Sequence, residues 1–310
     1  MLDAVMYNLM METQAAIFAA ASASGFSVVE ARETPPALVQ VNAGRAESPD
    51  WFLVQAAEFE PEPLTVANLR VRDVYAAPRM VQALLDLMAS AGWLEHDGRD
   101  NYALTPAGRT ILQRSRQRLQ TRLAVLAPPL AINVEDLSVL LGRVIASSLA
   151  APTPPGTWCL AHSRWRAPAG NAPALAQVMH YFDDFNAFRD DAHMAAWRPH
   201  AVDGYAWEAF ALVVRGEVQT TDALFDLLAH RGYRRVEYAH ALTDLVERGW
   251  LEHDASSGLT HGTADGVALH TAVERATDQF FYDPWTCLSD DEMARLKTHL
   301  ELVRHSVGEA

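Results

Sequence analysis

The chain of 310 residues is 50% hydrophobic and 21% charged, which is typical of a globular protein with room for two domains and excludes a largely disordered chain. Its formal net charge is −14, of which −4 falls on residues 1–155 (12 Arg against 16 Asp and Glu) and −10 on residues 156–310 (13 Lys and Arg against 23 Asp and Glu). Because basic side chains neutralise phosphates, this balance makes the second half the poorer candidate for nucleic-acid contact.

The beginning of the chain predicts a helix. Residues 1–21 are mainly apolar, but Asp3 and Glu12 interrupt them and no basic segment precedes them, so we expect an amphipathic helix and not a signal peptide. Its apolar stripe either packs on the other half of the protein or lines an apolar ligand pocket. No stretch has the roughly 18 uncharged apolar residues of a membrane span. Only Cys159 and Cys287 are present, not in metal-ligand spacing, which predicts a cytoplasmic protein with reduced thiols.

Three helices are predicted in the next part of the chain. Residues 26–50 contain three prolines and predict a loop with one extended segment at 38–41. Helices are predicted over 51–58 and 65–75, with corresponding helices at 206–214 and 221–230 in the second half. A third helix, with apolar residues at helical spacing, is predicted over 78–91.

The hexapeptide Gly-Trp-Leu-Glu-His-Asp occurs twice, at 92–97 and at 249–254. A repeat at this spacing predicts the duplication of a unit of about 150 residues. Each copy follows a predicted helix, 78–91 or 235–248, at a glycine suited to a left-handed helix stop. A polar turn, a short strand and a Thr-initiated helix follow each copy, and this order is typical of a winged helix. We interpret the tryptophans as core anchors and the aspartates as turn residues.

The segment Leu-Thr-Pro-Ala-Gly-Arg at 104–109 resembles the end of the wing in regulators of the MarR type. Two helix starts are also similar to that family, at 133–136 and at 288–292. The resemblance implies a mainly α fold with small β-wings, in which tandem winged helix-turn-helix modules are related by pseudo-two-fold symmetry, so that a monomer acts as a pseudo-dimer. It divides the chain into a first module at 1–150, a linker and insert at 151–173, and a second module at 174–310.

By position, the helix before each hexapeptide is the recognition helix, and the resemblance implies a transcriptional regulator that binds double-stranded DNA. Arg and Gln read guanine and adenine edges, and an Arg in a wing reaches a minor groove or a phosphate. The second predicted wing, 255–263, has neither Arg nor Lys, which departs from the family pattern and leaves open weak, asymmetric or lost DNA binding. The candidate DNA contacts are Arg70, Arg72, Arg79, Gln82 and Arg99 in the first module and Arg234, Arg235 and His240 in the second.

Two segments between the repeats have alternative interpretations. Residues 110–126 predict a long helix with Arg114, Arg118 and Arg122 in one row, which is either a solvated face or a stripe that faces an anion. Residues 158–173 have no recognisable counterpart in the first half and form either a packed connector or a flap over a pocket. A small aromatic or apolar effector is expected between the halves, in contact with Trp158, His162, Trp165, His180, Phe182 and Trp197.

The helix predicted at 174–197 is rich in His, Asp and Phe. His180 and Asp184 share a face at i, i+4, and Asp190 and His193 form an i, i+3 pair. The pattern is typical of a solvated acidic face with local salt bridges, of the wall of a ligand pocket, or of a metal or catalytic site. The tighter helical motif of two His flanking a Glu does not occur in the sequence, so no metal is predicted.

Two functions follow from these observations. The first is a DNA-binding transcriptional regulator of MarR-like type with an effector pocket between the halves and no cofactor. The alternative is a winged-helix scaffold recruited as a small-molecule-binding protein, or as an enzyme in which His180, Asp184 and His193 are catalytic, that no longer binds DNA. The sequence has no phosphate-binding loop, nucleophile elbow or Cys-His pair, which favours a protein without enzymatic activity. A protein-interaction module is a third option.

Overall fold

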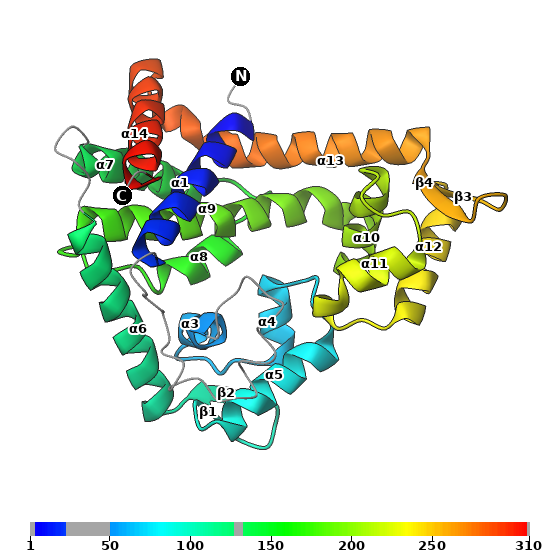
Figure 1. Cartoon of the computed structure of the whole chain (residues 1–310), viewed down its shortest axis with the longest axis horizontal. Coiled ribbons are helices and arrows are strands. Elements are labelled where there is room, and N and C mark those ends of the chain that lie inside the picture. The colour runs from blue at the N-terminus through cyan, green and yellow to red at the C-terminus, as the bar shows by residue number, and fades with distance from the viewer. Residues whose placement is uncertain (1–3, 23–49, 127–132, 309–310) are drawn as a thin grey trace.

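The computed structural model describes residues 4–22, 50–126 and 133–308 (Figure 1), so the extended segment predicted at 38–41 lies outside it. The described protein is mainly helical, and none of its helices is long and apolar enough to cross a membrane. The helices are α1 (Ala4–Ser22), α3 (Asp50–Phe59), α4 (Val66–Arg72), α5 (Pro78–Ser90), α6 (Pro106–Val125), α7 (Val134–Leu149), α8 (Trp158–Arg164), α9 (Ala174–Trp197), α10 (Gly204–Val214), α11 (Thr221–Leu227), α12 (Arg235–Glu247), α13 (Ala264–Tyr282) and α14 (Asp290–Gly308). The strands are β1 (Leu94–His96), β2 (Tyr102–Leu104), β3 (Leu251–Asp254) and β4 (Leu259–Gly262).

A body of long helices forms the upper part of the molecule in Figure 1. Its central helix is α9, which packs against α7, α8 and α13, while the N-terminal α1 lies along the C-terminal α14. Phe182, Phe185 and Phe188 of α9 are fully buried in its core, together with Phe281 and Trp285. The apolar stripe of α1 belongs to the same core. The helix therefore packs on the other half of the chain, which is the first of the two alternatives given for this stripe.

Two helix-turn-helix units are attached to this body. The first unit consists of α3, α4 and α5 with the hairpin β1–β2, and the second unit consists of α10, α11 and α12 with the hairpin β3–β4. Both hairpins are antiparallel, with Leu94 opposite Leu104 and Leu251 opposite Gly262. Two hairpin wings are therefore present where the two hexapeptides predict them.

The same contacts close both hairpins. Gly92 and Gly249 have φ angles of +75° and +74°, and they follow α5 and α12 as the predicted left-handed stops. Thr105 donates its hydroxyl to the Gly92 carbonyl at 2.6 Å, and Thr263 donates its hydroxyl to the Gly249 carbonyl at 2.7 Å. Each threonine is also the N-cap of the helix that follows, α6 or α13, so one side chain joins the recognition helix to the helix after the wing.

A second glycine in each unit permits this closure. A Cβ at Gly108 would lie 2.2 Å from the Trp93 carbonyl oxygen, and a Cβ at Gly266 would lie 2.0 Å from the Trp250 carbonyl oxygen. No side chain tolerates such distances, because heavy atoms in contact lie about 3.5–4.0 Å apart. The approach of α6 to β1, and of α13 to β3, therefore requires glycine.

Two predicted helices are shorter in the structure. The helix predicted at 65–75 ends at Arg72, where the N–H of Asp73 donates to the Leu69 carbonyl. The helix predicted at 221–230 ends at Leu227, and a short 3₁₀ turn leads from it to Gly232, with a φ of +78°. Both ends precede a recognition helix, so these turns set where α5 and α12 begin.

Candidate functional site

The two units meet through the residues that lead into α5 and α12. Ala77, the N-cap of α5, donates its N–H to the Arg231 carbonyl at 2.8 Å. In the first turns of the two helices, Arg79 makes a bidentate ion pair with Glu237, with N···O distances of 3.0 and 2.6 Å. The Arg79 guanidinium lowers the pKa of the Glu237 carboxyl to about 2. We call this surface the inter-unit contact, made by residues 73–80 and 231–237.

The predicted DNA contacts before α5 point into the protein. Arg70 donates its Nε–H to the Ala76 carbonyl at 3.2 Å. Arg72 makes an ion pair with Asp190 of α9, and only 13% of its side chain is exposed. Arg72 therefore links the first unit to the body in this arrangement, and a DNA contact would require it to leave Asp190.

The other predicted contacts of the first unit lie on its surface. Gln82 donates to the Asp86 carboxylate at 3.1 Å and also contacts the Tyr102 hydroxyl. Arg99 is exposed at the tip of the first wing, where the Asp97 carboxylate accepts its backbone N–H at 2.7 Å. The Arg99 guanidinium is therefore placed to extend beyond the wing.

In the second unit, the predicted contacts surround the start of α12. Arg234 lies 3.3 Å from Glu237, and Arg235 makes an ion pair with Asp222 of α11. His240 is exposed one turn further along the helix. The structure thus brings Arg79, Arg234 and Glu237 together, while His240 and Arg235 face outward.

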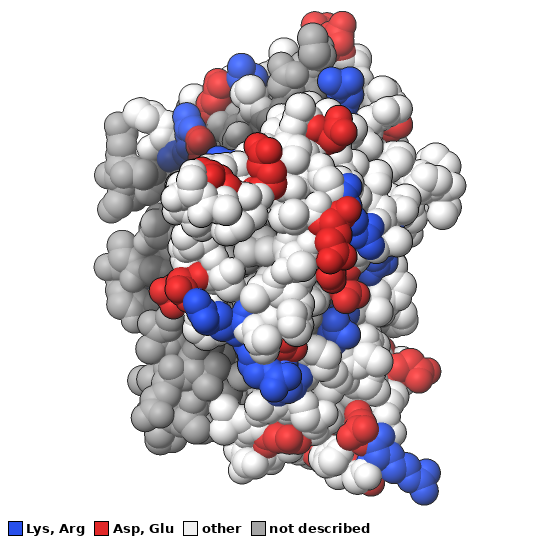
Figure 2. Space-filling model, turned by 90° about the vertical axis from the view of Figure 1, so that its right-hand side faces the viewer, with Lys and Arg blue, Asp and Glu red and all other residues white. Residues whose placement is uncertain are grey.

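The outward surfaces of α5 and α12 are not strongly basic. Exposed residues of α12 include Asp244 and Glu247, and the exposed face of α5 includes Asp86. Figure 2 shows a face that is largely uncharged, with acidic and basic side chains interspersed. Helix-turn-helix proteins present the N-terminal residues of the recognition helix to base edges. Here the inter-unit contact occupies both N-termini.

A cavity of about 780 Å³ lies between the first unit and the body. It is bounded by α1, α3, α4 and α6, by α9 with the segment that precedes it, and by Arg231 of the second unit. Pockets for small molecules typically measure about 300–1,000 Å³, so the cavity has the size of a ligand site. Its apolar wall includes Val54, Leu112, Leu119, Leu123 and Met179, and its polar wall includes Gln55, Arg72, Asp73, Arg116, Arg166, His180, Asp183, Asn186, Asp190 and Arg231.

Arginines dominate the polar wall. Arg166 makes an ion pair with the buried Glu58 and lies 3.1 Å from Asp183. Nη2 of Arg116 is buried and has no hydrogen-bond partner among the described residues. Burial lowers the pKa of Arg116, and the charge of Arg166 lowers it further, but a guanidinium stays protonated at neutral pH. A buried donor without an acceptor is costly, so an acceptor group of a ligand would be stabilised there.

His180 lines the cavity beside a buried carboxylate. Its Nε2 lies 3.3 Å from Asp184 Oδ1 without forming a hydrogen bond, so the two share a face of α9 as predicted. Ser163 and Arg164 each donate to Asp184 at 2.7 Å. Burial lowers the pKa of His180 to about 2 and raises the pKa of Asp184 to about 6. His180 is therefore neutral at neutral pH, and it is not poised as a proton donor.

The interpretation of α9 as a solvated acidic face is wrong. Asp184 is fully buried, and Asp191 is 5% exposed. Arg189 donates to Asp278 of α13 at 3.0 Å instead of pairing within its own helix. The helix is apolar around most of its circumference, and such a helix lies inside a protein.

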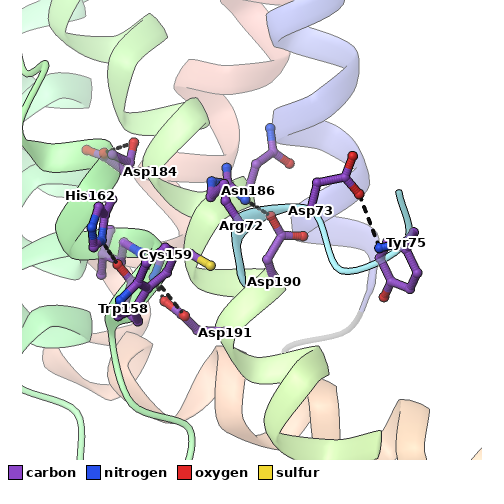
Figure 3. A network of polar contacts seen from close by, with 12 residues as sticks. Arg72, Asp73, Tyr75, Trp158, Cys159, His162, Asp184, Asn186, Asp190 and Asp191 are labelled. Carbon is purple, nitrogen blue, oxygen red and sulfur yellow. Dashed lines mark hydrogen bonds and ion pairs between the residues drawn. The ribbon is translucent and has the colours of Figure 1, made fainter. Parts of the chain in front are cut away.

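The first part of the insert, α8, is a packed connector, whereas residues 166–169 of the insert line the cavity. Figure 3 shows Asp191 pointing to the N-terminus of α8, where its carboxylate accepts the N–H groups of Cys159 at 2.8 Å and Leu160 at 3.0 Å. The preceding residue, Asp190, points to Arg72 of the first unit. Two consecutive carboxylates of α9 thus hold two different elements, and burial raises the pKa of the enclosed Cys159 thiol.

Of the six residues predicted for the effector, His180 lines the cavity. The rings of Trp158 and His162 are in contact, with centroids 3.9 Å apart and planes tilted by 32°, beside Phe59 of α3. Trp165 is 68% exposed. The remaining two predicted aromatic residues are buried in the cores of the protein. The cavity of the described structure therefore has a different wall from the one predicted.

The predicted pair of Asp190 and His193 does not form. Trp207 donates its indole N–H to His193 Nε2 at 3.2 Å, and His193 Nδ1 lies 3.1 Å from the Thr277 hydroxyl. Burial lowers the pKa of His193 to about 4, so it is neutral at neutral pH. Within the described residues, no three His, Cys, Asp or Glu side chains are grouped to hold a metal ion.

Most residues of the polar wall, including Arg231, were not predicted, whereas Arg166 belongs to the insert that was interpreted as either a connector or a flap over a pocket. Arg116 carried a readable signal, because it follows Leu112 by four residues and precedes Leu119 by three on the apolar face of a helix. An arginine in such a position must find a polar partner in the interior. The other arginines come from segments far apart in the chain, and only the fold brings them together.

Comparison with known proteins gives one assignment. A model described as a helix-turn-helix family matches residues 116–310, which is more than half of the chain and includes the second unit with its wing. No curated protein and no solved structure matches the chain significantly. The match agrees with the order of elements in the second unit, in which α11 and α12 precede a hairpin. The chain belongs to this helix-turn-helix family.

Proposed function

We propose that the protein is a DNA-binding transcriptional regulator of MarR-like type, in which two winged-helix modules fused in one chain act as a pseudo-dimer. Family membership supports DNA binding, because a helix-turn-helix places its second helix in the major groove. The observation that carries the proposal is the recurrence of a recognition helix, a left-handed glycine and a Thr-closed wing in both units. The modules span 1–150 and 174–310, with a linker and insert at 151–173.

In this proposal, the outward faces of α5 and α12 read the DNA. Arg79 and Gln82 lie at the start of α5, and Arg99 extends from the first wing toward a phosphate or a minor groove. Residues 255–263 of the second wing carry no Arg or Lys, so the first unit supplies more of the phosphate contact. The second unit contributes Arg234, Arg235 and His240.

The cavity of about 780 Å³ is the proposed effector site. Leu112, Leu119 and Met179 offer an apolar surface to an aromatic or aliphatic body. Arg116 offers a buried donor to a carboxylate or phenol oxygen of the same molecule. A ligand in this position contacts both the first unit and α9, so its binding changes how the first unit is held whenever the two arrangements bind it with different affinity.

DNA binding is tested by fluorescence anisotropy with a labelled duplex that spans the region upstream of the gene. We expect log K to fall linearly with log salt concentration, because bound phosphates release counterions. A specific site is expected to bind at least about a thousandfold more tightly than an unrelated duplex of equal length at the same salt concentration. No measurable binding to either duplex at about 50 mM salt, where phosphate contacts are strong, would contradict the proposal.

A second candidate function is a small-molecule-binding protein that no longer binds DNA. The net charge of −14 and the occupied N-termini of α5 and α12 favour it. Of the predicted catalytic residues, His180 lines the cavity, which supports binding more than turnover. Thermal-shift measurements with small aromatic acids test the site. Stabilisation of the wild type that is lost in Arg116→Met, combined with no duplex binding, would favour this second function.

A further inference from the structure

We propose that the inter-unit contact is an autoinhibitory lock, which holds the N-termini of α5 and α12 against each other and keeps both recognition helices out of the DNA grooves. The inference rests on the proposed DNA binding. It adds that the described arrangement is the inactive one, and that the two units must separate before they bind a duplex.

The N-termini of α5 and α12 are much closer together than two DNA half-sites. Paired helix-turn-helix units read half-sites about 34 Å apart, one helical turn of DNA, with the N-terminal residues of each recognition helix at the base edges. Here Arg79 in the first turn of α5 lies 2.6 Å from Glu237 in the first turn of α12. The backbones at Ala77 and Arg231 are hydrogen-bonded at 2.8 Å. Two helices joined at these ends cannot enter two successive major grooves.

The close packing of the contact carries the second step. Gly232 has a φ of +78°, and a Cβ at this position would lie 2.4 Å from the Met80 Cβ of the first unit. Tyr233 donates its hydroxyl to the Ala76 carbonyl at 3.4 Å, and Arg79 lies over the Tyr233 ring at 5.8 Å from its centroid. The second unit thus has a glycine where α5 approaches it most closely, which indicates a fitted surface and not a chance encounter.

The strength of the contact carries the third step. The side chains of Arg79 and Glu237 are 43% and 26% exposed, and ion pairs so exposed contribute little because water screens them. A weak ion pair allows the two units to separate. A bound ligand or DNA shifts the equilibrium between joined and separated units only by the difference in its affinity for these two states.

Arg231 connects the lock to the cavity. Its carbonyl accepts the Ala77 N–H, while its guanidinium lines the cavity and lies 3.5 Å from Asp73 of the first unit and 2.7 Å from Glu208 of the second. An anionic group bound in the cavity competes with Asp73 for this guanidinium. Binding in the cavity thereby weakens one of the contacts that hold the two units together.

A cross-linking experiment tests the lock directly. The double variant Arg79→Cys with Glu237→Cys is joined by a short bifunctional maleimide, and its affinity for the upstream duplex is compared with that of the same variant left unjoined. We expect at least about a tenfold loss of affinity on cross-linking, because the competent state is removed. Each single-cysteine variant, treated in the same way, measures the loss caused by modification of position 79 or 237, of Cys159 or of Cys287 alone, and the cross-linked double variant should lose at least about tenfold more affinity than either single variant. Equal affinity of joined and unjoined protein would overturn the lock.

A charge-matched pair of variants tests it independently. Glu237→Gln removes the Arg79 ion pair and is expected to bind the duplex about two- to fivefold more tightly, as the loss of an exposed pair allows. Glu217→Gln removes the same charge from the same unit, where Glu217 pairs with Arg215 at 2.5 Å outside the contact, and should leave the affinity near that of the wild type. An equal increase in duplex affinity in both variants would mean that the change in net charge causes the effect, and it would overturn the lock. Absence of duplex binding by the wild type and every variant would overturn the proposed function itself.

Discussion

The two helix-turn-helix units use the same elements, but they are attached to the body in different ways. The second unit shares a core with α9 and α13, in which Trp207 stacks on Trp197 with ring centroids 6.0 Å apart. The first unit has a core of its own, and Arg72 and Arg166 tie it to α9 through ion pairs around the cavity. Apolar burial therefore anchors the second unit to the body. The first unit is held by these ion pairs and by smaller apolar contacts, in which Ala77 enters the core of the second unit and Phe59 packs on Trp158 of α8.

This difference indicates which unit can move. Separating buried aromatic rings exposes a large apolar area to water, whereas separating ion pairs at the edge of a cavity exchanges one polar environment for another. Because the cavity adjoins the first unit, the proposed effector would act on the unit whose attachment to the body is the more polar of the two. We expect a response to consist of a displacement of the first unit relative to a fixed second unit and body.

The largest effect is expected from Trp207→Ala. Trp207 is 1% exposed, and its loss should lower the free energy of unfolding by about 3–5 kcal/mol through the cavity that remains between α9 and α10. Equilibrium unfolding in urea measures this change. Trp165→Ala removes a tryptophan that is 68% exposed and should change stability by no more than about 0.5 kcal/mol. Similar losses in both variants would mean that the second unit is not anchored by its apolar core.

The pH dependence of stability examines the wall between α9 and the first unit. Burial lowers the pKa of His180 from 6.5 to about 2, so below pH 6.5 the unfolded chain binds a proton that the folded protein does not. The contribution of His180 to the free energy of unfolding should therefore fall as the pH decreases from 6.5, by up to about 1.4 kcal/mol per pH unit. Asp184, with its pKa raised from 3.8 to about 6, acts in the opposite sense between these two values, because protonation favours its folded form.

The His180→Gln variant isolates the histidine from Asp184. In this variant the free energy of unfolding should not show the decrease below pH 6.5 that comes from His180. His240→Gln, at an exposed position of α12, should keep the pH dependence of the wild type. Urea unfolding at several pH values gives both slopes. If His180→Gln kept the full slope, the buried histidine would not be its source.

A smaller effect is expected from Arg72→Ala. The loss of the ion pair with Asp190 should cost about 1–2 kcal/mol, less than for a fully buried pair, because 48% of the Asp190 side chain is exposed and water screens it. Hydrogen exchange should accelerate in α3–α5 and not in α10–α12. Arg235→Ala, which breaks an exposed pair with Asp222, should leave exchange in both units unchanged. Faster exchange in both units alike would contradict the difference in attachment.

The two wings offer the finest comparison. Arg99→Ala should reduce the slope of log K against log salt by about 1, the effect of one lost phosphate contact. Ser257→Arg places a cation in the turn of the second wing and should increase the slope by about 1 where that wing also touches DNA. Anisotropy titrations at several salt concentrations measure both slopes. An unchanged slope for Arg99→Ala would exclude the first wing from the DNA interface.

Local patterns predicted much of the fold. The helix at 174–197 has the predicted bounds, and both hairpins follow the hexapeptides as expected, because glycine stops, threonine caps and apolar periodicity act over a few residues. The burial of this helix was not predicted. Its carboxylates suggested a solvated face, whereas Asp184 and Asp191 are satisfied inside the protein by Ser163, Arg164 and the N-terminus of α8.

The candidate site was less accessible to prediction, since it depends on contacts between distant segments. The ion pair of Arg79 and Glu237 joins positions 158 residues apart. The residues around Arg79 do not indicate that it pairs with Glu237, and the residues around Glu237 do not indicate Arg79. The cavity likewise combines five helices with the segment before α9 and with Arg231. The predicted effector residues came from an aromatic-rich insert and from α9, but aromatic side chains also pack against one another, as Trp158 and His162 do.

The closure of the wings also constrains how this protein can evolve. In each unit a threonine hydroxyl holds the glycine carbonyl that ends the recognition helix, and a second glycine passes within van der Waals distance of the tryptophan carbonyl. A substitution at any of these positions disturbs the others, so selection acts on the set together. The residues at the tips of the hairpins do not take part in this closure. One tip carries Arg99 and the other carries serines, so the residues at a wing tip can be substituted without disturbing the joint that positions the wing.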